Sequence, residues 1–253
     1  MPELLPGEEA KVKVQQRQRR MWLARRVEII SSSPHARRPP CILARDCGGC
    51  SLQHLSVEAQ NNWKQERLTN TLTRIGQLDP DVNALVSPDQ ESLGYRNRAL
   101  IPVRRDGLKV RLGYYKRGSH RIVNLNHCPV LDPRLDALIA PIKQDLESTS
   151  WPMDSDLQGD PGLRHLGLRI GVRTGEVLIT LISATRSLQG VEVLSAAWMR
   201  RWPQLKGVTL NLQPKRNNAV FGDQTVCLQG EDAICLLYTS DAADEGLGVD
   251  LGG

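Results

Sequence analysis

Three cysteines within ten residues are the group in this sequence best placed to do chemistry. They lie in the run Cys41-Ile-Leu-Ala-Arg-Asp-Cys47-Gly-Gly-Cys50, and the chain has only six cysteines in 253 residues. The two glycines between Cys47 and Cys50 allow a tight turn that can point both flanking sulfurs toward one centre. A thiolate site for zinc or for an iron–sulfur cluster generally takes four donors. The spacing therefore predicts a soft-metal site and does not separate zinc from iron–sulfur.

Cys128, in His127-Cys128-Pro129, is the natural fourth donor. A proline directly after a cluster cysteine recurs in ferredoxin-type runs. One alternative is that the cysteines are reduced residues that fill the core. Another is that Cys128 is the nucleophile of a cytosine methyltransferase, but the other three thiols would then lack a fourth donor. A disulfide framework does not suit clustered thiols in a chain of this length in which we see no signal peptide.

Positive charge is segregated along the chain. Residues 11–45 hold ten Lys and Arg against one acid, and residues 94–121 hold nine against one. The rest of the chain carries 14 cations and 26 acids, although the net charge is only +5. A merely solvated surface mixes its signs, so two cationic blocks in an otherwise acidic chain indicate a surface that contacts phosphates. Nucleic acid is the partner that we expect.

The elements that must position these residues follow an α+β pattern. A polar–apolar alternation predicts strands at residues 11–15 and 22–30. Ser56 can cap a helix that ends at Gly76, and Asp132-Pro133 opens a second helix that Pro141 should kink. Asp106-Gly107 is typical of a hairpin turn. Further strands are predicted at residues 99–103, 108–115, 121–125, 164–172, 177–183, 208–212 and 219–221, and a third helix at 188–202.

Four stretches together resemble one known family. They are the cysteine run, Leu52-Gln53-His54, Tyr95-Arg96-Asn97-Arg98, and the segment from Ser119-His120 to Cys128. The family is the bacterial RNA (uracil-5-)-methyltransferases, in particular the 23S rRNA enzymes that carry a 4Fe–4S cluster. The likeness covers about residues 5–236, and its cysteine pattern matches Cys41, Cys47, Cys50 and Cys128 position by position.

The resemblance implies a domain organisation. Residues 1–33 look like an incomplete TRAM-like β segment, a partial β-barrel (TRAM/OB-like) remnant, and residues 34–92 like a cysteine-cluster segment with a helix. Residues 93–236 resemble a central, mixed α+β RNA-binding domain. Residues 237–253 match nothing in the family and are expected to be a non-native, disordered tail. The Rossmann-like methyltransferase domain of the family is expected to be absent.

The resemblance also implies a reaction. Family members use a cysteine thiolate to activate uracil C5 and S-adenosylmethionine as methyl donor, with an acidic base. No catalytic and no S-adenosylmethionine-binding residue is expected here, since Cys227 and Cys235 do not match the nucleophile. We therefore expect the N-terminal and central part of such an enzyme, inactive by itself, with a 4Fe–4S cluster that supports RNA binding. S-adenosylmethionine would bind only to the full-length parent, which is expected to be monomeric.

The expected partner is RNA, with rRNA ahead of tRNA and the target uridine undetermined. The basic residues of the second block are predicted to contact phosphates rather than to read bases. These residues are Arg96, Arg98, Arg104, Arg105, Lys109, Arg111, Lys116 and Arg117. No apolar run is long enough to cross a bilayer, so a soluble, cytoplasmic protein is expected.

Two other functions fit the same residues. A non-catalytic RNA-binding protein with a structural zinc would show the same cysteines and basic blocks, and iron content would separate the two. A radical enzyme that uses S-adenosylmethionine is a third class, but its usual C-x3-C-x2-C spacing is absent.

Overall fold

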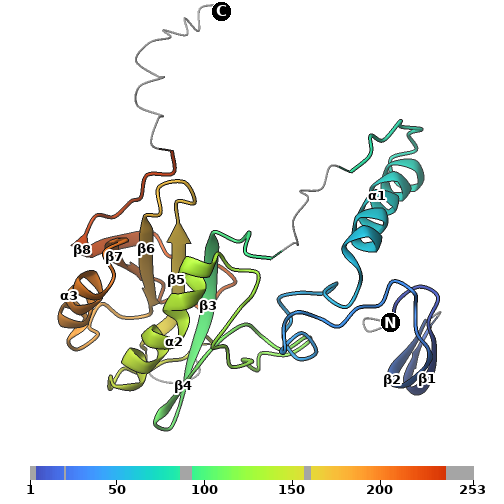
Figure 1. The fold of residues 1–253 in the computed structure, drawn as a ribbon. Coiled ribbons are helices and arrows are strands. Elements are labelled where there is room, and N and C mark those ends of the chain that lie inside the picture. The colour runs from blue at the N-terminus through green and yellow to red at the C-terminus, as the bar shows by residue number, and fades with distance from the viewer. Residues whose placement is uncertain (1–3, 20, 86–92, 157–160, 238–253) are drawn as a thin grey trace, which may run out of the picture. The chain divides into compact units, whose positions relative to one another are not determined.

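The computed structural model describes residues 4–19, 21–85, 93–156 and 161–237 (Figure 1). Contacts divide the chain into two compact units, Met1–Ser92 and Leu93–Gly253. The predicted non-native tail lies outside the described residues, apart from Leu237. None of the described helices combines the length and the apolar character needed to span a membrane.

Unit 1 begins with a two-stranded antiparallel ribbon. Strand β1 (Glu9–Gln18) pairs with strand β2 (Met21–Ser31), which confirms both strands predicted from the alternation. Arg17 lies opposite Trp22 in the register, and its guanidinium is 5.7 Å from the centroid of the indole ring. Trp22 is 62% exposed, so apolar as well as charged side chains of this ribbon face solvent.

Helix α1 (Val57–Arg74) follows in unit 1 and begins as predicted. The Ser56 side chain accepts a hydrogen bond from the backbone N–H of Ala59, which satisfies one of the free donors of the first turn. Gln60 is the one buried residue of this helix. Leu68 and Ile75 are 50% and 80% exposed, so the apolar stripe of the helix is left largely uncovered.

Unit 2 is a six-stranded mixed sheet with two helices. The strands run in the order β4-β3-β5-β6-β7-β8, and only the β6–β7 pair is parallel. The hairpin with Gly107 in its turn (φ +62°) is confirmed. The elements are β3 (Arg98–Asp106), β4 (Lys109–Leu112), α2 (Pro133–Glu147), β5 (Leu163–Ile170), β6 (Val177–Ser183), α3 (Val191–Arg201), β7 (Leu205–Leu212) and β8 (Gln224–Gly230).

Both helices lie on one face of this sheet (Figure 1). Trp198 of α3 is fully buried and donates its indole N–H to Asp145 of α2 at 2.7 Å, and Arg201 pairs with the same carboxylate. Ile101, Val103 and similar apolar residues of the strands form the core beneath the helices. The opposite face of β3, β5 and β6 has no helix on it among the described residues.

Two strand predictions are wrong. Residues 121–125 make only one bridge, between Ile122 and Tyr115. Residues 219–221 are irregular, because Asn211 and Gln213 hold this loop with their side chains, and the last strand begins at Gln224. At residues 219–221, side chains therefore replace the ladder partners that a strand would need, whereas residues 121–125 keep backbone hydrogen bonds to residues 112–116 without forming a continuous ladder.

Arg105 joins the sheet to the end of α2. Its guanidinium donates to the carbonyl oxygens of Leu146, Thr149 and Trp151 at 2.8–2.9 Å. Carbonyl groups at a helix C-terminus lack partners within the helix, and the negative end of the helix dipole favours a cation there. Arg105 therefore completes the C-terminus of α2 from a neighbouring strand.

His165 of β5 is buried on the face of the sheet away from the helices. It is 7% exposed, and its Nδ1 has no hydrogen-bond partner among the described residues. Burial and the neighbouring Arg164 guanidinium lower the pKa of His165 to about 4. The imidazole is therefore neutral at pH 7.

We expect Arg105→Ala to lower the free energy of unfolding by roughly 2–3 kcal/mol, because several part-buried hydrogen bonds to a charged group are lost. Arg105→Lys should recover little, since one ammonium cannot reproduce the guanidinium fork. Urea unfolding followed by circular dichroism measures this. The control is Arg111→Ala, whose exposed pair with Asp106 should contribute about 0–1 kcal/mol. Equal losses in the two alanine variants would contradict the role of Arg105.

The buried His165 predicts acid sensitivity. The unfolded chain takes up this proton at about pH 6.5, whereas the folded chain does so only at about pH 4. The stabilisation from the neutral imidazole is therefore complete above the unfolded pKa and is lost as the pH falls between the two values. At pH 5 the free energy of unfolding should be about 2 kcal/mol lower than at pH 7.5 on account of this residue. A His165→Gln variant should lack this part of the decrease, and the same pH dependence in both proteins would refute the assignment.

Candidate functional site

The first three predicted metal ligands lie on one loop of unit 1. Cys47 is buried, and Cys41 and Cys50 are half-buried. The backbone N–H of Gly49 donates to Cys47 Sγ at 3.4 Å. Gln53, from the stretch that follows the cysteines, accepts a hydrogen bond from the Cys41 backbone N–H at 3.2 Å. Hydrogen bonds therefore hold this loop at the backbone of Cys41 and at its glycine turn.

Cys128, the predicted fourth ligand, lies in unit 2 immediately before α2. It is buried, and its backbone N–H donates to Asp136 Oδ1 at 2.6 Å. The other oxygen of Asp136 is hydrogen-bonded to His127 Nδ1. Asp136 belongs to the first turn of α2, where the helix dipole favours a carboxylate. One acidic side chain thus fixes the backbone on which Cys128 is carried.

The donor set suits a soft metal, because thiolate sulfur is the ligand that zinc and iron–sulfur clusters share. Across the described ranges, no three His, Cys, Asp or Glu side chains are grouped so that they could hold a metal ion. Three of the thiols belong to unit 1 and the fourth to unit 2. Metal binding by these four cysteines stays a prediction.

The predicted phosphate contacts have unequal surroundings in the structure. Arg104 pairs with Asp154 and Asp156 at 3.3 and 3.8 Å, and Arg105 is engaged with carbonyl oxygens as described above. Arg111 pairs with Asp106 at 2.7 Å on an exposed surface. Acidic and carbonyl partners within the chain already offset much of the positive charge at these three positions.

Arg96 is half-buried beside two tyrosines. Burial by itself lowers the pKa of Arg96, but its interactions with Tyr114 and Tyr95 outweigh burial and leave the pKa above its ordinary value. Its backbone N–H and C=O bond to Val130 and Asp132, which ties the stretch to the segment that carries Cys128. Arg96 therefore links the predicted interface to the predicted metal ligand within unit 2.

The remaining four cations reach solvent to different degrees. Lys109 and Lys116 are exposed, and Arg117 is half-buried. Lys116 and Arg117 lie in a turn closed by the hydrogen bond from the Lys116 N–H to the Arg121 carbonyl, at 2.7 Å. Arg98, exposed on β3, lies 5.7 Å from the ring centroid of Phe221.

Two residues beside Arg98 were missed by the sequence prediction. Arg169 lies directly opposite Arg98 in the β3–β5 register, and Phe221 lies in the loop before β8. The alternation within residues 164–172 would have placed Arg169 on the face of the strand opposite the apolar Leu166, Leu168 and Ile170. No local pattern indicates Phe221, because side chains distant in sequence position its loop.

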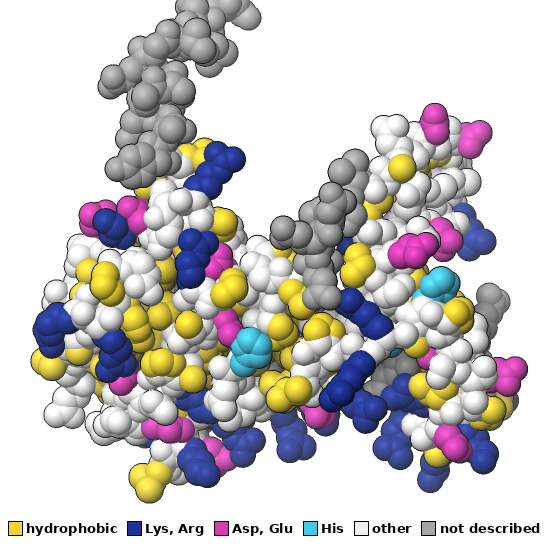
Figure 2. Space-filling model, in the orientation of Figure 1, with side chains coloured by type: hydrophobic (Ala, Val, Ile, Leu, Met, Phe, Trp, Pro, Cys, Tyr) yellow, Lys and Arg dark blue, Asp and Glu magenta, His cyan; other side chains and the backbone are white. Residues whose placement is uncertain are grey.

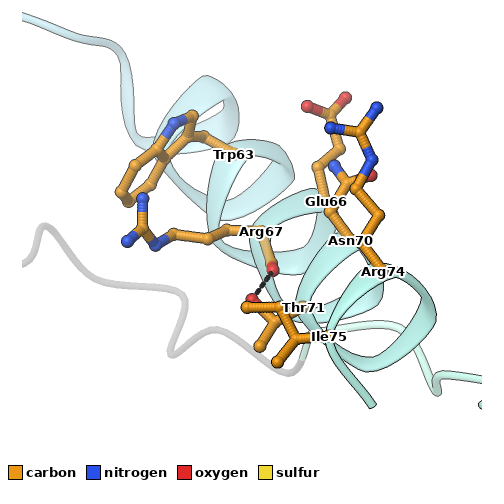
Figure 3. A pocket seen from close by; sticks show the side chains of 7 residues that line it. All are labelled: Trp63, Glu66, Arg67, Asn70, Thr71, Arg74 and Ile75. Atoms are coloured by element: carbon orange, nitrogen blue, oxygen red, sulfur yellow. Dashed lines mark hydrogen bonds between the residues drawn. The ribbon is translucent and has the colours of Figure 1, made fainter. Parts of the chain in front are cut away.

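Two further surfaces in unit 1 combine aromatic and basic side chains. On α1, the Arg67 guanidinium lies 5.4 Å from the Trp63 ring centroid, and Arg74 extends from the next turns (Figure 3). On the β1–β2 ribbon, Lys13 lies opposite Arg25, and Lys and Arg side chains gather there (Figure 2). Both surfaces have the composition of a nucleic-acid interface.

Comparisons with known proteins link this chain to one group. No protein-family model matches the chain. It is 56% identical to an uncharacterized RNA methyltransferase of Parasynechococcus marenigrum over 94% of this chain and 51% of that protein. It is 43% identical to an uncharacterized RNA methyltransferase of Synechocystis over 93% of this chain and 51% of that protein. The chain spans about half the length of these relatives.

A solved structure has a similar fold. It is the tRNA (uracil-54, C5)-methyltransferase of Pyrococcus abyssi in complex with S-adenosyl-L-homocysteine, with a TM-score of 0.61 and 22% sequence identity. The match covers 91% of this chain and 50% of that chain. At this level of identity the likeness concerns the fold.

This match corrects the predicted fold class, which is wrong in excluding a Rossmann-like methyltransferase domain. The chain shares its fold over most of its length with a methyltransferase solved with S-adenosyl-L-homocysteine. The sheet is mixed and carries helices on one face, and β6, α3 and β7 form a β-α-β unit with parallel strands, the unit from which Rossmann-like sheets are built. The exclusion rested on motifs, and motifs do not report how strands pair.

Over more than nine-tenths of its length, the chain is related in sequence to proteins that bear the name RNA methyltransferase.

Proposed function

We propose that the protein is an S-adenosylmethionine-dependent RNA (uracil-5-)-methyltransferase that acts on 23S rRNA. The observation that carries the proposal is the 56% identity over 94% of the chain to a protein named an RNA methyltransferase. The uracil-5 reaction is supported by the cysteine pattern at Cys41, Cys47, Cys50 and Cys128. S-adenosylmethionine would supply an electrophilic methyl group. Location in the cytoplasm stays a prediction.

In this proposal the described residues bind and orient RNA. Lys109, Lys116 and Arg98 are three of the four exposed cations of the predicted set, and they contact phosphates, whereas the fourth, Arg111, pairs with Asp106. Arg104, Arg105 and Arg111 already bond to oxygen atoms of the chain. Their main role in this proposal is to hold strands and loops in place. Residues 93–236 thus act as an RNA-binding domain, and residues 1–33 and α1 add basic surface.

The four cysteines are proposed to hold a 4Fe–4S cluster that supports RNA binding. Cys41, Cys47 and Cys50 supply three thiolates from one loop, and Cys128 supplies the fourth from the segment fixed by Asp136. Cys41, Cys47, Cys50 and Cys128 bound to one cluster would connect two stretches of the chain that are distant in sequence. The reaction at uracil is not routed through it.

Methyl transfer tests the proposed function. The protein that carries this sequence should release tritium from uridine labelled at C5 in a 23S rRNA fragment when S-adenosylmethionine is present, because methylation replaces that hydrogen. A tRNA transcript is the second substrate, since the structural neighbour is named for tRNA. Methyl transfer to RNA without tritium release would overturn the uracil-5 assignment, and preference for the tRNA would overturn the rRNA target.

Metal content tests the cysteine site. Protein purified without oxygen should contain about four iron atoms and absorb in the visible range, as a 4Fe–4S cluster does. Cys47→Ser should remove both the iron and the absorption, whereas the control Cys227→Ser, at an exposed position in β8, should leave them unchanged. One zinc atom and no iron would favour the alternative, a non-catalytic RNA-binding protein with a structural zinc.

Salt dependence tests the phosphate contacts. The logarithm of the binding constant for an rRNA fragment should fall linearly with the logarithm of salt concentration, and Lys109→Ala should reduce the slope by about 0.7, the value for one contact to a single strand. Arg200→Ala, an exposed cation of α3, is the control that should not change the slope. Affinity that does not depend on salt would argue against phosphate recognition.

A further inference from the structure

A groove runs across the face of the sheet that α2 and α3 leave uncovered. It has a volume of about 290 Å³ and is built on three adjacent strands, β3, β5 and β6. Its walls carry Arg98, Arg169, Leu178 and the ring of Phe221. Apolar and cationic side chains therefore surround one shallow depression, and no acidic residue is among those that line it.

The floor of the groove is set by a glycine. Gly167 pairs with Leu100 of β3 on one side and with Thr180 of β6 on the other, so the three residues form one row across the sheet. A Cβ atom at Gly167 would lie 3.2 Å from Thr180 Cβ and 3.4 Å from Leu100 Cδ2. The missing side chain thus leaves a flat surface of backbone and aliphatic carbon.

Two guanidinium groups stand beside this floor. Arg98 and Arg169 are direct partners in the antiparallel register and both are exposed. Like charges directly opposite each other destabilise a sheet, so the pair has an electrostatic cost in the absence of an anion. Because no carboxylate lines the groove, an anion from outside the chain would relieve that cost.

The aromatic wall is held in place by its loop. Gln213 Nε2 donates to the carbonyl oxygen of Phe221 at 2.8 Å, and Asn211 exchanges two hydrogen bonds with the backbone of Gly222. A Cβ at Gly222 would approach the Leu212 carbonyl oxygen to 1.7 Å, so the loop lies directly against β7. Phe221, the only phenylalanine of the chain, therefore has a fixed backbone, and the residue is 38% exposed.

We propose that this groove binds one unpaired nucleotide of a single-stranded RNA. The base packs on the floor at Gly167 and Leu100 and against Phe221, and the adjoining phosphate lies between Arg98 and Arg169. An aromatic ring and aliphatic floor suit any base, because every base has a π-face, and the two arginines supply the charge for the backbone. Bases in a duplex are stacked and paired, so only a single-stranded or splayed nucleotide can enter. The inference rests on the proposed RNA-binding function and adds Arg169 and Phe221 to it.

Binding of a labelled single-stranded RNA of about ten nucleotides at low salt, measured by fluorescence anisotropy, tests the proposal. Phe221→Ala should weaken binding by about 5- to 150-fold, the range for loss of one base–aromatic stack. Phe221→Trp should retain binding, which guards against a general effect of changing the loop. Arg169→Ala should lower affinity and reduce the salt slope by about 0.7. Val193→Ala and Arg200→Ala, both exposed on α3, are the matched apolar and cationic controls.

An abasic strand separates base packing from phosphate binding. The unsubstituted protein should bind it as weakly as Phe221→Ala binds the normal strand, and Phe221→Ala should not distinguish the two strands. If the unsubstituted protein binds RNA but Phe221→Ala and Arg169→Ala behave like the controls, the groove is not the site and the proposed function stands. If the unsubstituted protein binds no RNA, the proposed function fails and this inference fails with it.

Discussion

Burial of one face of the β4-β3-β5-β6-β7-β8 sheet beneath α2 and α3 is the constraint on which the rest of unit 2 depends. The two helices are joined by the indole N–H of Trp198 and by Arg201, which both bond to Asp145. Because successive strand residues alternate between faces, this single burial determines which side chains can face outward. The row Leu100, Gly167 and Thr180, and the pair Arg98 and Arg169, are therefore consequences of how the core packs.

The parts of this fold that sequence predicts are those set by neighbouring residues. Ser56 and Asp132 cap their helices, and Asp106-Gly107 turns its hairpin as predicted, because these signals act over a few residues. The parallel pairing of β6 with β7 and the irregular loop that carries Phe221 were not predicted. Both depend on partners far along the chain, such as Asn211 and Gln213, and local patterns carry no information about them.

The candidate site also separates what local sequence predicts from what depends on residues far along the chain. A block of positive charge was visible in the sequence, but the structure gives its members different roles. Arg104 and Arg105 bond to oxygen atoms of the chain, whereas Lys109 and Arg98 are exposed. Net charge over a segment therefore predicts that a phosphate-binding surface exists without identifying its residues. For the cysteines, the sequence names four predicted ligands, and the structure adds how Asp136 holds the segment that carries the fourth, Cys128.

The carbonyl contacts of Arg105 also bear on how alignments of such proteins should be read. A planar fork that meets several carbonyl oxygens tolerates no substitute, so selection for folding alone would keep arginine at this position. In an alignment, this position would look as invariant as a position that contacts RNA, and its residue would carry the same charge. A basic residue in a basic segment can thus be required by a helix end, whereas an exposed neighbour such as Lys109 is the one proposed to contact RNA.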